Sequence, residues 1–180
     1  MTAFKIFIKN DKLIWTRSRI LFAAFLFSFV IFSIKVYLIG KTESDTVEKI
    51  FGFIMIVLMV LGLINSLLRE QLNGKLNGEI IFDYEKIVIG EDNYYLADIR
   101  QITIDIRNYK GQLISSDAGF WEMFSNGINN ELTMILNSEE VIKCYFQINY
   151  KREIVKANKE LRNYVDEGKL LKKNYFEITS

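Results

Sequence analysis

The chain has 180 residues, half of them hydrophobic, and a formal net charge of +1, so its overall charge gives no argument for nucleic-acid binding. It contains no His, one Cys and no Pro, which removes the commonest general base and metal ligand, an internal disulfide and proline-rich linkers. The apolar runs lie in the first seventy positions. The length suits a membrane hairpin followed by one domain of about 100 residues.

Residues 1–19 are basic, with apolar side chains interspersed. Five cations stand against the single Asp11: Lys5, Lys9, Lys12, Arg17 and Arg19. A short strand and an amphipathic segment lying on the membrane are both open interpretations. We predict a basic cytoplasmic tail whose charges set membrane topology.

The first apolar run, ILFAAFLFSFVIFSI, covers residues 20–34 without a charge. If Lys35 extends its ammonium towards water, the run continues to residue 39 and reaches about twenty residues, the usual length of a membrane span. Trp15 and Tyr37 lie near its two ends, where aromatic side chains favour the interface. A cleaved signal peptide is the competing interpretation, but no A-x-A pattern follows the run. We therefore predict a retained helix over residues 20–39.

The second run, Ile50–Leu68, has nineteen uncharged residues between charged pairs. As a helix it would be about 28 Å long, close to the roughly 30 Å hydrocarbon core of a bilayer. We predict a second span over residues 50–68, within a helical hairpin over 20–70. The ten-residue connection over 40–49 makes the two helices antiparallel neighbours. Both flanks are richer in Lys and Arg than this connection, which predicts a multi-pass protein of the inner (cytoplasmic) membrane with both termini cytoplasmic.

Small side chains indicate where the two helices touch. Ala24 and Ser28 are four residues apart on the first helix, as are Gly62 and Ser66 on the second. Each pair shares a helix face and permits close approach of the backbones, so we predict helix–helix packing there. Asn65 lies at similar depth, where an interhelical partner is favoured over lipid; lining a substrate path is the alternative if the protein oligomerises.

Beyond the second run the pattern changes from continuous apolar sequence to alternation. Residues 71–78 (QLNGKLNG) form a polar linker. Six segments then alternate with the period of a strand: 79–84, 86–89, 94–96, 99–106, 131–136 and 141–148. Their short connections predict a largely antiparallel sheet. A helix is expected over about 150–167, with Asn149 as its N-cap and Gly168 after its end.

This order of elements resembles the pleckstrin-homology-like (PH-like) plan, in which a C-terminal helix covers an antiparallel sheet or barrel. The matching sequences are GEIIF, YYLADI before a long alternating strand, FQI before a helix, and KELRNYV at the end of that helix. GINNEL is similar to a stretch in small membrane proteins of uncharacterised function from Bacteroidetes-type bacteria. The resemblance implies an α+β protein with a two-helix membrane hairpin, a PH-like domain over 79–172 and a tail over 173–180.

Catalytic patterns are not evident in the sequence. Cys144 alternates with apolar neighbours on the inward face of a strand, which favours a buried small hydrophobe over a reactive thiolate. The glycines of the linker lack the GKS or GKT of a phosphate loop. An acidic cluster at 83–92 is better explained as a solvated turn than as a cation site. We therefore predict no catalytic, metal or cofactor-binding residues.

Eukaryotic PH domains often bind phosphoinositides through cations near the first two strands. Here residues 78–106 carry seven acidic side chains against Lys86 and Arg100, which argues against an anionic headgroup at that place. Two other regions are candidate binding surfaces. One contains the aromatic residues Tyr109, Phe120, Trp121 and Phe124, for which both a core and a surface position are open. The other is a basic helix face that either is simply solvated or faces anionic lipid: Lys151, Arg152, Lys156, Lys159 and Arg162.

These features together predict a bacterial, non-enzymatic membrane protein. Its cytoplasmic domain would act as an interaction or scaffolding module for a protein partner or a membrane surface. The alternative is a small accessory or regulatory subunit of a larger membrane transport or secretion complex. The expected partners are the lipid bilayer and another protein or a second copy of the chain; nucleic acid and cofactors are not expected.

Overall fold

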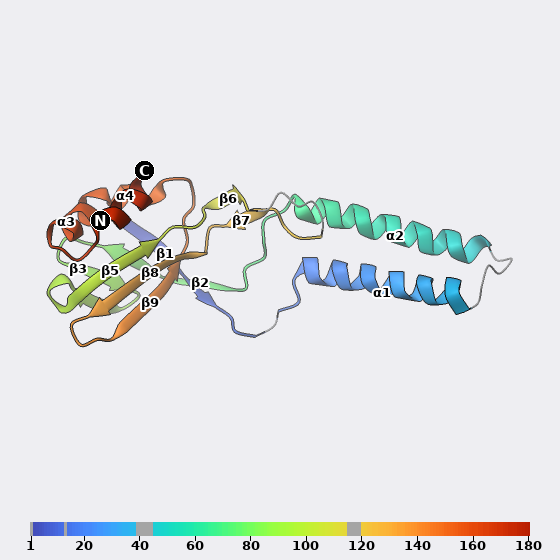
Figure 1. Ribbon diagram of the computed structural model, residues 1–180, viewed down its shortest axis with the longest axis horizontal. Helices are drawn as coiled ribbons and strands as arrows, with labels where there is room; N and C mark the ends of the chain where they lie inside the picture. The colour runs from blue at the N-terminus through green and yellow to red at the C-terminus, as the bar shows by residue number, and fades with distance from the viewer. Residues whose placement is uncertain (1, 13, 39–44, 115–119) are drawn as a thin grey trace. The chain divides into compact units, whose positions relative to one another are not determined.

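The computed structural model describes the whole chain except residues 1, 13, 39–44 and 115–119. It divides into two compact units (Figure 1). The sheet unit comprises Met1–Lys12, Leu72–Gln112 and Ser125–Ser180, and the helical unit comprises Leu13–Gln71 and Leu113–Phe124. The chain therefore passes from one unit to the other after residues 12, 71, 112 and 124.

The sheet unit is built on a seven-stranded antiparallel sheet with the strand order β4-β3-β2-β1-β9-β8-β5. The strands are β1 (Thr2–Lys9), β2 (Gly74–Phe82), β3 (Lys86–Ile89), β4 (Asp92–Tyr95), β5 (Ile99–Asp105), β8 (Asn130–Leu136) and β9 (Val141–Phe146). The six predicted strands are present with small shifts of their ends. The predicted linker is shorter than expected, because β2 already begins at Gly74. The strand order is linear, with β4 and β5 at its ends, so the sheet is not a closed barrel.

The first strand is the main departure from the predicted organisation. Residues 1–19 were expected to be a basic tail, but Thr2–Lys9 forms β1 between β2 and β9. Phe4 pairs with Ile80 and Ile6 with Phe146, and both inward side chains are buried while Lys5 is exposed. The structure shows the short strand that was one of the two open interpretations of this segment. Its two partner strands lie far along the chain, so no local pattern distinguished it from a surface segment.

The core lies between the sheet and a layer of C-terminal helices. Phe4 makes edge-to-face contacts with Phe82 and Phe146, at ring-centroid distances of 5.7 and 5.6 Å. Ile102 and Ile104 are buried on the same face of β5, as their alternation predicted. The covering layer consists of the 3-10 helix η2 (Glu153–Ala157), α3 (Asn158–Asp166) and α4 (Lys172–Thr179). It contributes four fully buried side chains: Ile154, Ala157, Leu161 and Tyr164.

The C-terminal helical region differs from the prediction at its start and agrees at the end of α3. Asn149 is not an N-cap; its backbone N–H and side-chain amide both donate to Glu153 Oε2, at 2.5 and 3.2 Å. Gly168 follows α3 with φ +70°, and the N–H groups of Gly168 and Lys169 donate to the carbonyls of Val165 and Tyr164. This pattern is a Schellman motif, which a left-handed glycine closes at low cost. The predicted tail instead contains α4, which buries Ile178.

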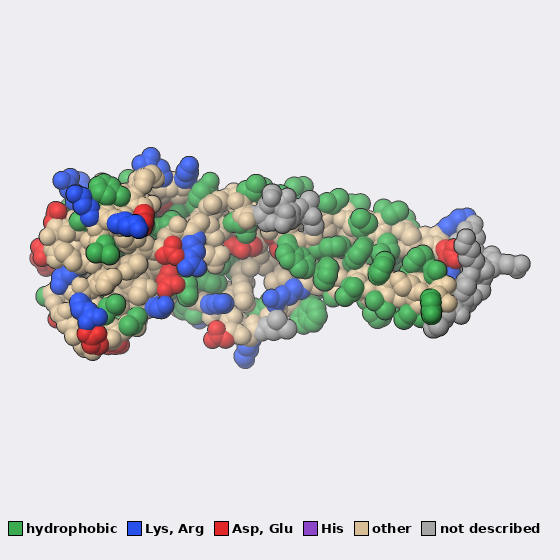
Figure 2. All heavy atoms as spheres, viewed as in Figure 1, with side chains coloured by type: hydrophobic (Ala, Val, Ile, Leu, Met, Phe, Trp, Pro, Cys, Tyr) green, Lys and Arg blue, Asp and Glu red, His purple; other side chains and the backbone are tan. Residues whose placement is uncertain are grey.

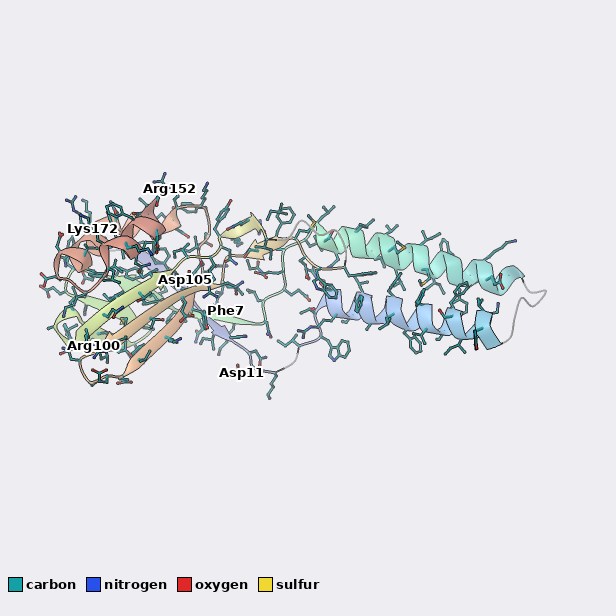
Figure 3. The ribbon with its side chains drawn as sticks, in the orientation of Figure 1. Phe7, Asp11, Arg100, Asp105, Arg152 and Lys172 are labelled. Atoms are coloured by element: carbon teal, nitrogen blue, oxygen red, sulfur yellow. The ribbon has the colours of Figure 1, made fainter. Side chains whose placement is uncertain are left out.

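Residues after α3 also cover the outer edge of β5 (Figure 3 labels Arg100 and Asp105 towards its two ends). The Ile102 N–H donates to the Lys169 carbonyl at 2.7 Å. The Asn174 side-chain amide pairs with both backbone groups of Ile104, at 2.9 and 2.7 Å. These contacts use the backbone groups on which an added strand would depend. The β5 edge is therefore not the strand edge that a partner would extend.

The helical unit contains two long apolar helices, α1 (Arg17–Leu38) and α2 (Asp45–Ser66). Both are long and apolar enough to cross a membrane. They are antiparallel neighbours: the Phe32 and Phe51 rings lie 6.4 Å apart, and Lys35 Nζ is 3.8 Å from a Glu48 carboxylate oxygen. Figure 2 shows hydrophobic side chains along the visible face of the pair. Such exposed apolar helices are candidate membrane spans, as the sequence predicted.

Cys144 has the environment expected from the sequence, and this gives a first prediction. It is buried in the sheet core, and burial raises the pKa of its thiol to about 11. Because thiolate is the reactive form, we expect alkylation at pH 8 to be about two orders of magnitude slower in the folded protein than in urea. A maleimide reaction followed by mass spectrometry measures both rates. Equal rates would show that this strand is open to solvent.

The sign of the pH effect follows from the same shift. The folded protein holds the thiol proton more tightly than the unfolded chain. The contribution of Cys144 to stability is therefore complete below the unfolded pKa of about 8.5 and is lost as the pH rises towards 11. A Cys144→Ser variant removes this pH dependence and serves as the control.

Candidate functional site

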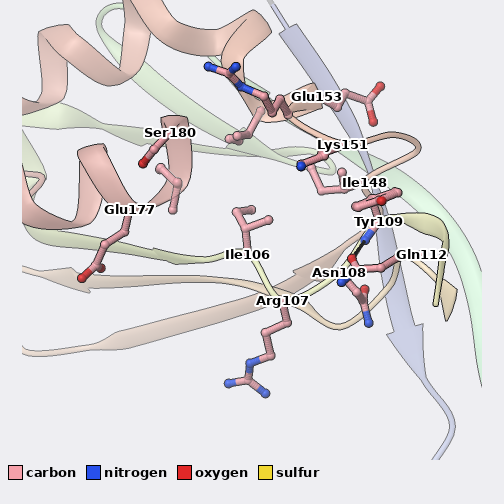
Figure 4. Close-up of a pocket in the computed structure, with 13 residues that line it drawn as sticks. Ile106, Arg107, Asn108, Tyr109, Gln112, Ile148, Lys151, Glu153, Glu177 and Ser180 are labelled. Atoms are coloured by element: carbon pink, nitrogen blue, oxygen red, sulfur yellow. Dashed lines mark hydrogen bonds between the residues drawn. The ribbon is translucent and has the colours of Figure 1, made fainter. Parts of the chain in front are cut away.

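A cavity of about 190 Å³ lies in the sheet unit, at the end of β5 (Figure 4). Most of its lining comes from three stretches, residues 106–109 after β5, residues 148 and 151–154 after β9, and the C-terminal end at 177–180, and Gln112 completes it. The structure thus brings together Tyr109 from the predicted aromatic surface and Lys151 and Arg152 from the predicted basic surface. These residues are more than 40 positions apart in the sequence, and no local motif joins them.

Asn130 fixes the stretch that follows β5. Its side chain is fully buried, and its Oδ1 accepts hydrogen bonds from the backbone N–H groups of Arg107 and Asn108, at 2.9 and 3.1 Å. Its Nδ2 donates to the carbonyls of Gly127 and Phe146, at 2.8 and 3.3 Å. One amide therefore satisfies four backbone groups where the sheet ladder ends. This network holds in place the stretch that carries Tyr109.

Gly127 adds a second constraint at the same place. It has φ +70°, and a Cβ there would lie 2.2 Å from the Ile148 carbonyl oxygen and 2.5 Å from the Lys110 nitrogen. Those two atoms are themselves hydrogen-bonded at 2.8 Å. Only glycine allows the backbone to approach so closely. The GINNEL stretch thus provides the glycine and the asparagine that shape one wall region of the cavity.

The charges around the cavity are mixed, and most of them are already paired. The Arg107 side chain points away from the helices, and its Nε donates to Asp105 at 2.6 Å, which raises the pKa of the guanidinium (Figure 4). Arg152 donates to the Thr179 carbonyl at 3.1 Å. Glu153 is buried and accepts from Asn149 and Lys156. Among the residues lining the cavity, Lys151 is exposed and can meet an incoming acidic or polar group.

The remaining predicted basic residues lie on exposed positions of the helical layer. Lys156 is 4.9 Å from the Tyr150 ring centroid and bonds Glu153, and contact with these two groups raises the pKa of its ammonium. Lys159 and Arg162 are exposed on α3. Only Lys151 and Arg152 of the five line the cavity. The structure therefore divides this set between a cavity wall and an exposed face of the helical layer.

The aromatic stretch at 120–124 belongs to the helical unit and not to the sheet core. The Phe120 ring lies 5.1 Å from Phe25 and 5.9 Å from Phe22, and the Trp121 ring lies 5.2 Å from Phe22. A Cβ on Gly62 would come within 2.7 Å of Phe120 Cδ1. Phe120 thus packs against α2 at Gly62. Trp121 remains half exposed and Phe120 is half-buried, and the favoured position in the core of the sheet domain is not what the structure shows.

Polar groups secure the same stretch in what we call the helix-end cluster: Arg17, Ser18, Asn65 and Glu122. Asn65 Nδ2 donates to Ser18 Oγ at 2.9 Å and to the Phe120 carbonyl at 2.8 Å. The Ser18 hydroxyl donates to Glu122, and Arg17 Nη2 lies 3.7 Å from the same carboxylate. Asn65 therefore has the interhelical partner that the sequence predicted. The role of Glu122 was not predicted, and its only sequence cue is a charge inside FWEMF.

The other predicted helix-packing residues have distinct environments. Ser66 bonds the Leu63 carbonyl through its side chain and accepts the Met123 N–H through its own carbonyl, at 2.7 and 2.9 Å. Ala24 and Ser28 are half-buried on α1. Phe124 is half-buried at the start of β7 (Phe124–Asn126), which pairs with β6 (Lys110–Leu113). The Phe120–Met123 stretch thus packs against the face of α2 that carries Gly62 and Ser66.

The chain matches no protein-family model, no curated protein sequence and no solved structure. Its function must therefore be inferred from the geometry. Within the described residues, no group of three His, Cys, Asp or Glu side chains is arranged to hold a metal ion. The described cavity combines a tyrosine, exposed cations and apolar walls, a composition suited to binding.

Proposed function

We propose that this protein is a membrane-anchored, non-catalytic interaction module. One observation carries the proposal: the apolar helix pair is inserted between two neighbouring strands. Lys9 at the end of β1 pairs with Gly74 at the start of β2, and most of the residues between them belong to the helical unit. The helices therefore occupy the place of the turn in a β-hairpin. A membrane anchor joined at both ends to one sheet holds that sheet at the bilayer surface.

This insertion supports the proposed topology. Strands β1 and β2 share one sheet, so they lie in the same compartment, and two spans are required to leave and return. Lys and Arg are more frequent beside the helix ends that connect along the chain to β1 and β2 than in the connection between the helices. By the positive-inside rule, we place the sheet unit in the cytoplasm and the connection on the outer face of the inner membrane.

We propose that the sheet unit is a variant of the PH-like plan in a bacterial protein. The antiparallel sheet and its C-terminal helical layer support this assignment. Two features depart from the plan: the sheet is open, and its first strand precedes the membrane helices. The acidic 78–106 stretch disfavours an anionic lipid headgroup there, so a protein is the better-supported partner for the domain.

We place the contact with that partner at the cavity beside Tyr109 and Lys151. Its volume of about 190 Å³ is below the roughly 300–1,000 Å³ of typical small-molecule sites, and it suits one anchoring side chain of a protein. Tyrosine and arginine are both enriched at protein interfaces, and Tyr109 and Arg152 line this cavity. The partner would insert an apolar side chain next to an acidic residue that meets Lys151.

Membrane topology is the first test. In a Cys144→Ser background, single cysteines at Thr46, Asp11 and Lys173 are labelled with a membrane-impermeant maleimide. We expect Thr46→Cys to react in intact cells, and Asp11→Cys and Lys173→Cys to react only after permeabilisation. Extraction of the protein by alkaline carbonate, or labelling of Asp11→Cys and Lys173→Cys on opposite sides, would refute the anchored arrangement.

Purification in mild detergent with mass spectrometry tests the partner and separates this function from an accessory subunit of a membrane complex. We expect Lys151→Glu to reduce recovery of a bound protein at least tenfold, while Lys159→Glu, on the exposed face of α3, leaves it unchanged. Recovery that depends instead on the helical unit, through Gly62→Leu, would favour the accessory-subunit function. Recovery unaffected by all three changes would exclude the cavity as the contact.

A further inference from the structure

Both tryptophans of the chain are exposed, and both belong to the helical unit. Trp15 lies two residues before α1 and is 64 % exposed, and the Trp121 ring packs on Phe22 of that helix while remaining 52 % exposed. Tryptophan is largely buried in most water-soluble domains, whereas it is enriched where membrane helices meet the lipid headgroups. The cations Arg17 and Arg19 lie at the same end of α1, as basic residues at that boundary do.

The stretch that carries Trp121, residues 120–124, keeps its single charge away from the surface. Glu122 belongs to the helix-end cluster, where the Ser18 hydroxyl donates to its carboxylate, and its side chain is only 10 % exposed. The exposed side chain beside it is the Trp121 ring. The stretch therefore presents an aromatic surface although a charge stands at its centre in the sequence.

The backbone of this stretch is not helical, but its polar groups have partners inside the helical unit. Four of its backbone groups are hydrogen-bonded there: the Phe120 carbonyl to Asn65 Nδ2 (2.8 Å), the Met123 N–H to the Ser66 carbonyl (2.9 Å), the Met123 carbonyl to the Ile114 N–H (2.8 Å) and the Phe124 carbonyl to the Glu70 N–H (2.9 Å). Non-helical backbone is tolerated at membrane depth only where the protein satisfies its N–H and C=O groups. These four bonds meet that condition beside the end of α2.

We propose that the Phe120–Phe124 stretch is a third membrane contact, which lies in the headgroup layer with the Trp121 ring against lipid. This inference rests on the proposed membrane anchoring, because the stretch extends the apolar surface of the two spans. The headgroup layer suits Trp121, since an indole combines an apolar ring with one N–H donor. The chain enters the helical unit twice, over 13–71 and over 113–124, so the sheet unit is joined to the membrane by both segments.

Fluorescence quenching by brominated lipid tests the proposal on the full chain, reconstituted in phosphatidylcholine vesicles. In a Trp15→Phe background, Trp121 is the remaining tryptophan, and bromine atoms on the acyl chains quench an indole ring that they approach. We expect bromines placed near the headgroup to lower its emission about twofold, and bromines placed near the bilayer centre to lower it less. Far-ultraviolet circular dichroism checks that each variant is folded.

Two single-tryptophan variants that also carry Trp15→Phe and Trp121→Phe provide the controls. Tyr95→Trp replaces a side chain that is exposed to the same extent, 52 %, but belongs to the sheet unit. It should be quenched by acrylamide in the water and by neither brominated lipid. Ile56→Trp replaces an exposed side chain in the middle of α2, and bromines near the bilayer centre should quench it most strongly.

The three reporters separate failure of this proposal from failure of the proposed function. If Trp121 behaves like Tyr95→Trp while Ile56→Trp is quenched, the proposal is overturned and the anchoring stands; this is also the result expected if a protein partner covers the stretch. Strongest quenching of Trp121 from the bilayer centre would overturn the interfacial position as well. If Ile56→Trp is not quenched by either lipid, the membrane anchoring itself is wrong, and the third contact falls with it.

Discussion

Replacing Asn130 by Ala is expected to lower the free energy of unfolding of the sheet unit by about 3–5 kcal/mol. The side chain is fully buried and completes four backbone hydrogen bonds, two as acceptor and two as donor. When the amide is removed, each broken hydrogen bond leaves a buried backbone donor or acceptor without a partner, which costs roughly 1 kcal/mol or more of stability. Alanine also leaves a small void. Urea unfolding of the full chain in detergent, followed by far-ultraviolet circular dichroism, measures the loss.

Asn129→Ala is the matched control, because Asn129 is the preceding residue and is exposed. We expect it to change stability by less than about 0.5 kcal/mol. Asn130→Asp distinguishes the donor bonds from packing: it keeps the shape and the acceptor atoms but places a carboxylate against the Gly127 and Phe146 carbonyls. It should destabilise at least as much as alanine at pH 7. Similar midpoints for Asn129→Ala and Asn130→Ala would disprove the role of this network.

Replacing Gly62 by Leu is expected to release the Phe120–Phe124 stretch from the helical unit. The glycine Cα lies so close to the Phe120 ring that even a Cβ would overlap two ring carbons, at 2.7 and 2.8 Å. Expelling Phe120 exposes a ring that packs on Phe22 and Phe25, which we estimate to cost about 2 kcal/mol. The docked stretch would then be roughly thirtyfold less favoured. Trp121 reports the change, because its ring loses contact with Phe22.

Gly52 provides the control on the same helix, since a Cβ there meets nothing within 4 Å. In a Trp15→Phe background, Trp121 is the remaining tryptophan, and its fluorescence should shift to the red in Gly62→Leu. The spectrum of Gly52→Leu should match that of the parent. A parent-like spectrum for Gly62→Leu would mean that Phe120 does not seat on this glycine.

Most strands of the sheet could be predicted from local patterns in the sequence. Ile102 and Ile104 alternate with polar neighbours, and a period of two residues was enough to place them on the buried face. Gly168 ends α3 as expected, because a Schellman motif needs a residue that readily adopts a positive φ. The position of β1 was not predictable in this way. Its pairing depends on strands that lie about 70 and 140 residues further along the chain.

The candidate sites depend even more on distant contacts. Asn130 was one asparagine in GINNEL, and its importance arises from backbone groups 22 and 23 residues before it. Phe120 and Trp121 had an apolar character that fitted both a core and a surface. Their neighbours are Phe22 and Gly62, and of these two only Gly62 was predicted to take part in helix–helix packing. Hydrophobic periodicity identifies which face is buried, but it does not identify what covers that face.

The place of β1 in the middle of the sheet has a consequence for biosynthesis. The ribosome completes β1 long before β9, and Ile6 and its partner Phe146 are separated by 146 − 6 = 140 positions. At roughly 5–20 residues per second, about 7–28 s pass between their syntheses. During that time the two apolar helices emerge and can enter the membrane. The apolar face of β1 that carries Phe4 and Ile6 then still lacks its partner strand β9. In the proposed membrane-anchored arrangement, insertion would therefore precede closure of the domain, and the nascent β1 would need protection from pairing with other chains.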